Sequence, residues 1–190
     1  MNCEGFLFDI YNVEEQVYVW ILDNENKPQL YIDTYYPTIY LDGPMNIIQR
    51  ILRRIVFYNA LKEKPVWVKK KHFYSNQEVK VLKVVLSKPS VMRKIFHKLY
   101  AYYGQMDIYH TDIEIPTGYS YFKKIFPLAN VKLEYEVVQA VNRIISIQTK
   151  DDISACEYEI PKLKVLQFYL KRNHRLGLNA NNPLIVKNDK

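Results

Sequence analysis

Helical periodicity in two segments, each flanked by short strand-like runs, is the feature that most limits how this chain can fold. Across residues 45–58 the apolar side chains recur at helical spacing and form one broad face, with arginines on the other face. A second such segment opens at Ser87-Lys88-Pro89, where Ser87 is expected to cap the helix and Pro89 to lie in its first turn. Each helix is therefore expected to cover a sheet with its apolar face.

The segments around these helices have the residue pattern of short β-strands. Before the first helix, turn residues separate four such runs, which predict a β-meander over residues 6–11, 17–22, 29–34 and 39–41. The second helix follows two predicted strands, 66–73 and 79–86, and precedes a third at 106–110. These elements together predict a β-β-α-β module.

The remaining elements are one short helix and further strands. The helix is predicted at 119–126, where Pro127 ends it, and the strands at 131–137, 142–149 and 164–169. The predicted fold class is α+β: mostly antiparallel β-sheet, with two or three packed helices and the β-β-α-β module.

The charge of the chain favours a polyanionic partner. Its 190 residues include 27 Lys and Arg against 20 Asp and Glu, a net charge of +7. The candidate nucleic-acid-binding residues are cations and aromatic rings, the combination that single strands require, and they are Lys69, Lys70, Lys71, Phe73, Tyr74, Arg93, Lys94 and Lys98. A solvated basic face on the helix, and a hairpin edge that lysines protect from pairing, remain the alternative interpretations.

No residue pattern in the chain predicts catalysis, a metal site or a cofactor. Cys3 and Cys156 match no metal-ligand spacing and are expected to be free thiols in a reducing compartment. The four histidines form no pair at helical ligand spacing, and Ser90 lacks the surroundings of a nucleophile. The chain has no run of about 18 apolar residues that would cross a membrane and no signal peptide at its start, so a cytoplasmic location is predicted.

Near the carboxyl end, a proline opens an alternating stretch and a second apolar run follows. Residues 161–171 read Pro-Lys-Leu-Lys-Val-Leu-Gln-Phe-Tyr-Leu-Lys, and Pro183-Leu184-Ile185-Val186 comes later. This pattern resembles the first strand of the proofreading exonuclease domain in family B DNA polymerases. In that family the strand carries an Asp and a Glu that bind the catalytic metals, and here those positions are Tyr169 and Lys171. A phenol and an ammonium group cannot replace two carboxylates around a divalent cation, so the resemblance implies a degenerate exonuclease site.

Three motifs upstream resemble blocks of the same family, in the same order. They are Tyr36-Pro37-Thr38-Ile39-Tyr40, similar to an Arg-Pro-Tyr-Ile-Tyr strand, then Leu86-Ser87-Lys88-Pro89 before a basic helix, and Asp112-Ile113 with the later Tyr119 and Pro127. The resemblance therefore covers most of the chain. It implies a polymerase amino-terminal domain over residues 1–157 and the start of an incomplete exonuclease-like domain over 158–190.

In archaeal members of the family this amino-terminal domain contacts the single-stranded template, and some members hold a pocket there that recognises uracil. The residues at the matching positions of this chain are Pro37, Thr38, Pro89, Met92, Pro116 and Gly118. The family has an aromatic residue at the position of Thr38 and an arginine at that of Gly118. Both departures count against recognition of uracil here.

The resemblance implies the amino-terminal part of an archaeal family B DNA-directed DNA polymerase, of a degenerate B2-like type with a split or truncated chain. This part would contact template DNA and scaffold a second chain that carries the polymerase motifs. Nucleotidyl transfer in DNA replication, and the Mg²⁺ that it needs, would then belong to the complete assembly. Two alternatives stay open: a freestanding module that binds single-stranded nucleic acid, and an inactive polymerase remnant.

Overall fold

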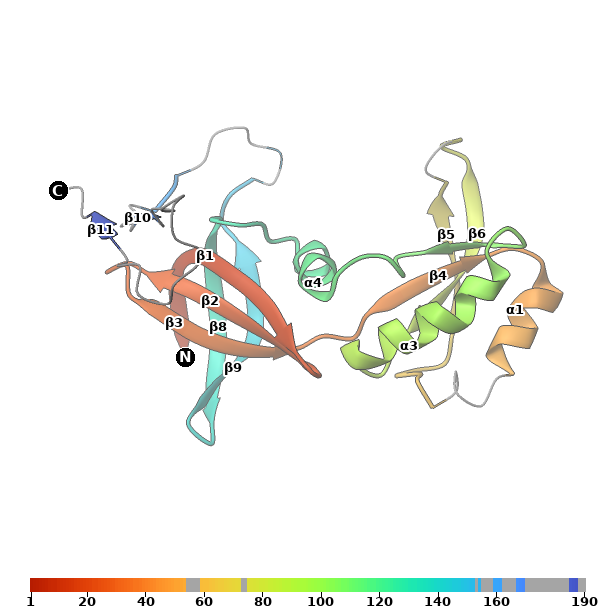
Figure 1. The fold of residues 1–190 in the computed structure, drawn as a ribbon, viewed down its shortest axis with the longest axis horizontal. Helices are drawn as coiled ribbons and strands as arrows, with labels where there is room; N and C mark the ends of the chain where they lie inside the picture. The colour runs from red at the N-terminus through yellow and green to blue at the C-terminus, as the bar shows by residue number, and fades with distance from the viewer. Residues whose placement is uncertain are drawn as a thin grey trace, which may run out of the picture. The chain divides into compact units, whose positions relative to one another are not determined.

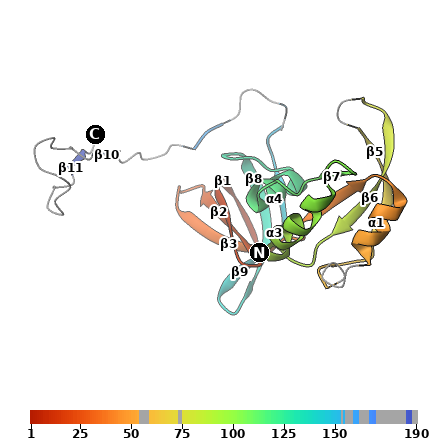
Figure 2. The same ribbon diagram turned by 45° about the vertical axis from the view of Figure 1, so that its right-hand side comes forward.

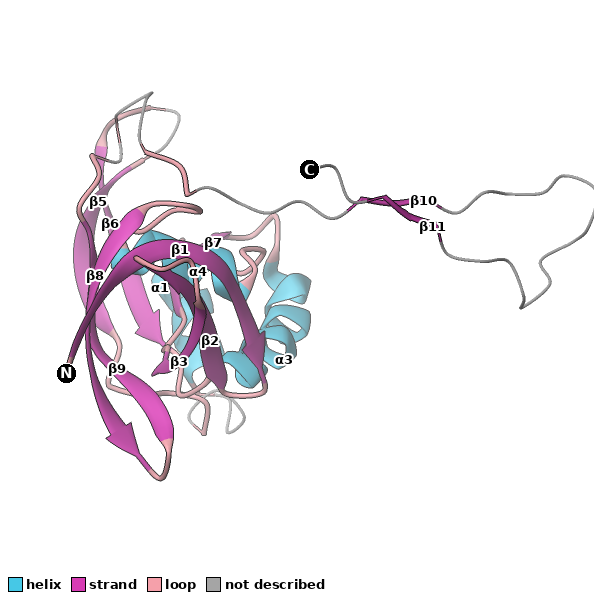
Figure 3. Cartoon of the chain, turned by 90° about the vertical axis from the view of Figure 1, so that its left-hand side faces the viewer, coloured by secondary structure: helices cyan, strands magenta, loops and turns pink. Residues whose placement is uncertain are grey.

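The computed structural model describes residues 1–53, 59–72, 75–152, 154, 159–161, 167–169 and 185–187. The chain divides into two units, Met1–Ile160 and Pro161–Lys190 (Figure 1). In the second unit, β10 (Gln167–Tyr169) and β11 (Ile185–Lys187) form an antiparallel pair (Figure 3). Strand β10 covers the end of the strand predicted at 164–169, and the earlier residues of that strand lie outside the described part of the chain.

Five strands of the first unit form a closed barrel in the order β1-β2-β3-β9-β8. They are β1 (Asn2–Val13), β2 (Gln16–Asp23), β3 (Pro28–Thr34), β8 (Asn130–Val138) and β9 (Val141–Thr149). All neighbours run antiparallel except β3 and β9, which are parallel. This order, with helix α4 (Ile115–Lys123) directly before β8, is that of the OB-fold, a five-stranded Greek-key barrel.

The barrel encloses one of two hydrophobic cores in the first unit. Alternate residues of its strands point inward and are joined by a side chain from α4; they include Leu7, Val17, Val19, Ile21, Val131, Leu133 and Tyr119. Tyr119 is fully buried, and the T-shaped contact of its ring with Tyr35, at a centroid distance of 5.8 Å, ties the helix to the end of β3. Helix α4 therefore closes one end of the barrel.

The other core lies under a four-stranded antiparallel sheet of order β5-β6-β4-β7. The strands are β4 (Thr38–Asp42), β5 (Val66–Lys71), β6 (Glu78–Val85) and β7 (Asp107–Tyr109). Helices α1 (Met45–Leu52) and α3 (Pro89–Leu99) lie on one side of it (Figures 1 and 2), and η1 (Tyr100–Tyr102) follows α3. The chain order β4-α1-β5-β6-α3-β7 is that of the ferredoxin-like fold.

The predicted α+β class, with mostly strands and three helices among the described residues, is confirmed. The prediction of a single meander over the first four strands is wrong, because β4 leaves the barrel and joins the second sheet. The ferredoxin-like module is thus inserted between β3 and α4 of the barrel. Sequence periodicity identifies strands, but it carries no information about which strands pair.

Two predicted helix starts need correction. The N-cap of α3 is Lys88, without a side-chain cap hydrogen bond, and the buried Ser87 hydroxyl has no hydrogen-bond partner. Helix α4 begins at Ile115 rather than at 119, because Pro116 sits in its first turn, where proline is tolerated. It ends at Lys123, before the left-handed Lys124 (φ 55°), and not at Pro127. Helix α1 runs to Leu52, and Arg53 is its C-cap. Residues 54–58 of its predicted span lie outside the described residues.

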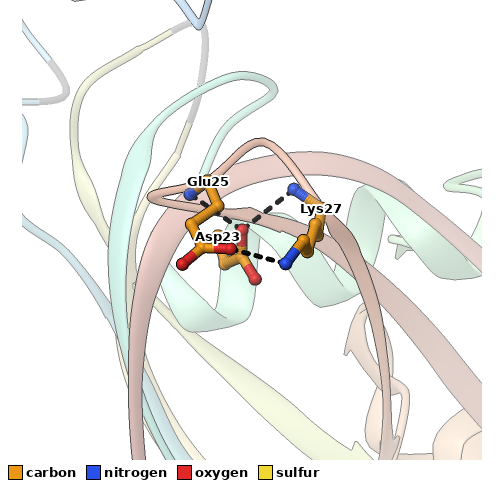
Figure 4. Close-up of polar contacts among 3 residues, drawn as sticks. All are labelled: Asp23, Glu25 and Lys27. Carbon is orange, nitrogen blue, oxygen red and sulfur yellow. Dashed lines mark hydrogen bonds and ion pairs between the residues drawn. The ribbon is translucent and has the colours of Figure 1, made fainter.

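The Asp23 side chain organises the turn between β2 and β3. One carboxylate oxygen accepts hydrogen bonds from the backbone N–H groups of Glu25 and Lys27, both at 2.9 Å (Figure 4). Because these bonds favour the ionised form, and that from Lys27 most, they lower the pKa of the Asp23 carboxyl.

Among the helices that the structure describes, none is long and apolar enough to span a bilayer.

Candidate nucleic-acid interface

Lysine side chains and phenol rings share the face of the four-stranded sheet that lies away from its helices. The register places Tyr40 of β4 opposite both Lys83 of β6 and Tyr109 of β7. Ile39 and Leu41, which flank Tyr40 in β4, are buried in the core, so side-chain alternation directs Tyr40 to the opposite face. Lys83 and Tyr109, paired with Tyr40, point to that face too. Lys70 of β5 extends over the same face, with its Nζ 5.4 Å from the centroid of the Tyr40 ring.

A cavity of about 410 Å³, here called the sheet cleft, runs along this face. Its lining combines a valine floor with aromatic and basic walls: Tyr40, Lys70, Lys71, His72, Val79, Val81, Tyr109, His110 and Tyr121. Each charged or titratable group in that lining is Lys, His or Tyr, as far as the described residues extend. The sheet cleft is therefore suited to an anionic ligand with flat, apolar rings.

A second cavity of about 110 Å³, here called the small pocket, adjoins the sheet cleft. The two share Tyr40, His110 and Tyr121. The rest of the small pocket comes from the start of β4, from β6, α3 and α4, and from the segments before β4 and α4; it comprises Tyr35, Pro37, Thr38, Lys83, Met92, Ile113, Glu114, Ile115, Gly118 and Phe122. These three residues can therefore contact a ligand in either cavity.

His110 stands on the boundary between the two cavities. Its ring lies edge-on to Tyr40 at a centroid distance of 5.1 Å and to Tyr121 at 6.1 Å. The backbone is left-handed here (φ 68°), a conformation that histidine adopts more readily than most residues. Burial lowers the pKa of His110, and Asp112 offsets this only in part. At neutral pH the imidazole is therefore uncharged, and because a backbone hydrogen bond with Thr38 engages one ring nitrogen, the other is left for a ligand.

Tyr35 occupies the space that a side chain at position 118 would need. A Cβ added to Gly118 would lie 2.9 Å from the Tyr35 hydroxyl oxygen and 3.6 Å from Cζ of the same ring. Tyr35 is itself buried, and burial raises the pKa of its hydroxyl. Tyr35 thus fills the part of the small pocket next to Gly118.

Replacing Gly118 by alanine should have different effects in two backgrounds. Alanine favours helix α4 by about 0.5–1 kcal/mol relative to glycine, but its methyl group crowds the Tyr35 hydroxyl, so little net gain is expected in the natural sequence. In a Tyr35→Phe background the hydroxyl is gone, and Gly118→Ala should then raise the free energy of unfolding by about 0.5–1 kcal/mol. Urea unfolding of all four proteins measures this difference, and an equal effect in both backgrounds would show that the hydroxyl does not face Gly118.

The structure brings together some of the pocket residues predicted from the family resemblance. Pro37, Thr38, Met92 and Gly118 line the small pocket. The two helix-opening prolines are not among its described lining residues: Pro89 is buried at the start of α3, and Pro116 is half-buried in the first turn of α4.

The predicted basic residues lie on different surfaces. Lys70 and Lys71 line the sheet cleft, whereas Lys69 points to the other face and forms an ion pair of 3.0 Å with Glu78. Lys94 is exposed on α3, away from both cavities. Phe73 and Tyr74, and the side chains of Arg93 and Lys98, lie outside the described residues. Among the residues that the structure describes, no group of three or more His, Cys, Asp or Glu could hold a metal ion. Tyr169 is in β10, and Lys171 is not described.

Sequence reasoning missed Tyr40, Lys83, Tyr109, His110 and Tyr121 as site residues. The alternation in β4 and β6 indicates that Tyr40 and Lys83 face away from the core, which is a usable signal. The proximity of Tyr109 and Tyr121 to them depends on the pairing of β4 with β7 and on the placement of α4, which no local pattern specifies.

Of three comparisons with known proteins, the one with solved structures finds a similar fold. No family model matches the sequence, and a search of curated proteins finds none that is similar. Among solved structures, the family B DNA polymerase from the hyperthermophilic archaeon Pyrobaculum calidifontis superposes with a TM-score of 0.62 over 89% of this chain, at 19% sequence identity. The match spans 22% of that polymerase's length. The chain therefore has a fold similar to one part of an archaeal family B DNA polymerase.

Proposed function

We propose that the chain is a polymerase-derived module that contacts single-stranded template DNA and scaffolds a second chain carrying the polymerase motifs. The observation that carries this proposal is the small pocket joined to a basic, aromatic sheet cleft. A fold alone does not imply a function, so the similarity to a polymerase supports the proposal only together with these cavities.

The dimensions and lining of the small pocket suit an unpaired base better than a duplex. A cavity of about 110 Å³ is far smaller than the groove that a double helix would need. Its walls combine apolar groups such as Pro37 and Met92 with the Thr38 hydroxyl and the neutral His110 ring, both able to hydrogen-bond a base edge. Lys70, Lys71 and Lys83 then stand where phosphates of the same strand would pass.

Binding of a single-stranded oligothymidine should weaken steadily as salt is raised. Three lysine–phosphate contacts predict a slope of about −2 for log affinity against log salt, at roughly 0.7 per contact with a single strand. Replacing Lys70 or Lys71 by glutamine should reduce the slope by about 0.7 each, because each substitution removes one contact. Fluorescence anisotropy measures these slopes.

Lys94→Gln is the matched control, since Lys94 is an exposed lysine outside both cavities, and its slope should equal that of the natural sequence. Absence of binding at low salt, or tighter binding of duplex than of single strand, would overturn the proposed template contact.

The proposed partner is a chain that carries the polymerase motifs, whose paired carboxylates bind the catalytic Mg²⁺. The tagged chain, isolated from its native cells, should retain this partner in stoichiometric amount, and mass spectrometry would identify its polymerase motifs. Recovery without such a partner would contradict the split-polymerase assembly.

A freestanding single-strand-binding module is the second candidate. The two hydrophobic cores within Met1–Ile160 favour it, because this unit has cores of its own. This candidate predicts the same salt-dependent binding without a partner. An inert polymerase remnant, the remaining alternative, predicts neither DNA binding nor a partner chain.

A further inference from the structure

We propose that the sheet cleft is the subsite for a second nucleotide, next to a base in the small pocket, so that the shortest ligand the chain binds well is a dinucleotide. This inference rests on the proposed single-strand contact and assigns its second position. One base would enter the small pocket, and its neighbour would lie on the valine floor of the sheet cleft, beside the Tyr40 ring on the next strand and with the Tyr109 ring on the strand beyond.

The sheet cleft has the chemistry of a base-stacking site. Its floor is formed by Val79 and the buried Val81 of β6, and the rings of Tyr40 and Tyr109 stand on the two strands beyond. Bases stack on aromatic rings with little regard for sequence, because every base has a π-face. We therefore expect this subsite to accept any base.

The boundary between the cavities determines how the two bases are held. The His110 ring stands nearly perpendicular to both Tyr40 and Tyr121, at interplanar angles of 89° and 81°. Because His110 lines both cavities, its ring stands between ligands that occupy them. The imidazole thus separates the two positions, and consecutive bases would be splayed apart, which only a single strand permits.

Lys70 is positioned to bind the phosphate that joins the two nucleotides. Its Nζ extends over the Tyr40 ring, which both cavities share, and the side chain is exposed with no acidic partner among the described ion pairs. Lys69, one residue earlier, is already paired with Glu78 on the other face. Of the two, Lys70 is therefore the lysine available to this linkage.

The test compares thymidine 5′-monophosphate with the 5′-phosphorylated thymidine dinucleotide by NMR titration of the full chain. The dinucleotide should bind roughly 5- to 150-fold more tightly, the range expected for one stacked base. Tyr109→Leu should remove most of this difference and leave the affinity for the mononucleotide unchanged. Tyr109→Phe keeps the ring and should retain the difference. Lys70→Gln, an exposed substitution that spares the fold, should also reduce it.

The outcomes separate this inference from the function on which it rests. Tyr18→Leu, on β2 of the barrel, should alter neither affinity. If the natural sequence binds oligothymidine but prefers the dinucleotide by less than about twofold, the second subsite is wrong and the proposed template contact stands. The second subsite is also wrong, and the proposed template contact stands, if Tyr109→Leu and Lys70→Gln both keep the preference for the dinucleotide that the natural sequence shows. If oligothymidine does not bind at all, the proposed function fails first, and the inference fails with it.

Discussion

Replacing Gly5 by alanine should lower the free energy of unfolding by about 3 kcal/mol, the upper end of what overpacking usually costs. At this residue β1 pairs with both neighbours in the barrel, opposite Asp23 of β2 and Val131 of β8. An added Cβ would lie 2.1 Å from the carbonyl oxygen of Leu22 and 2.9 Å from Cγ2 of Ile21. Because the nearer atom belongs to the backbone, relief requires the two strands to move apart, and the barrel would open.

Thermal unfolding measures this effect as a fall in Tm of about 6–12 °C for a chain of this size. Gly104→Ala is the matched control: nothing lies within 4 Å of its Cβ, and only the left-handed backbone (φ 84°) opposes the substitution, by about 1–2 kcal/mol. A Gly5→Ala protein that melts no lower than Gly104→Ala would mean that β1 and β2 do not approach each other as closely as described.

Replacing Asp33 by alanine should lower the free energy of unfolding by a similar amount, about 2–3 kcal/mol. One carboxylate oxygen of Asp33 accepts a hydrogen bond of 2.8 Å from the Tyr119 hydroxyl and forms an ion pair of 2.8 Å with Lys123. Tyr119 is fully buried, so without Asp33 its hydroxyl loses its acceptor where water cannot replace it. Lys123 is 21% exposed and can turn to solvent, so it adds less to the loss.

A double-mutant cycle isolates the hydrogen bond. Tyr119→Phe removes the hydroxyl, so Asp33→Ala should cost about 1 kcal/mol less in that background than in the natural sequence. Glu25→Ala, which breaks the exposed ion pair with Lys27, is the control and should change stability by less than about 0.5 kcal/mol. Additive effects of Asp33→Ala and Tyr119→Phe would show that the two side chains do not interact.

This contact also concerns the candidate site. Helix α4, which Asp33 holds against β3, carries Gly118, Tyr121 and Phe122 of the cavity walls. Loosening the helix would therefore widen the small pocket, and Asp33→Ala is expected to weaken single-strand binding although Asp33 lines neither cavity.

The sequence predicts most elements of the fold but not their assembly. Alternation within residues 17–22 marks a barrel strand, because Val17, Val19 and Ile21 are buried while Tyr18 and Trp20 between them are half-buried. The barrel, however, is closed by strands β8 and β9, far along the chain, and that pairing leaves no local signal. Helix α4 begins earlier than predicted for a different reason: Pro116 fits the first turn of a helix, so a proline there does not mark a helix boundary.

The site was only partly predictable for the same physical reason. The motif resemblance pointed to Pro37, Thr38, Met92 and Gly118, and these four residues line the small pocket. The lysine run 69–71 predicted a continuous basic track, but strand alternation sends Lys69 and Lys70 to opposite faces. The aromatic partners of Lys70 come from β4, β7 and α4, and only the three-dimensional structure places them together.

The most direct test of a single-strand interface on this module is an NMR titration of the isotope-labelled chain with a short oligothymidine at low salt. The account predicts that amide signals around Tyr40, Lys70, Tyr109, His110 and Gly118 shift on binding, while those of the barrel strand β2 stay in place. Shifts confined to the barrel, or no shifts at low salt, would contradict it.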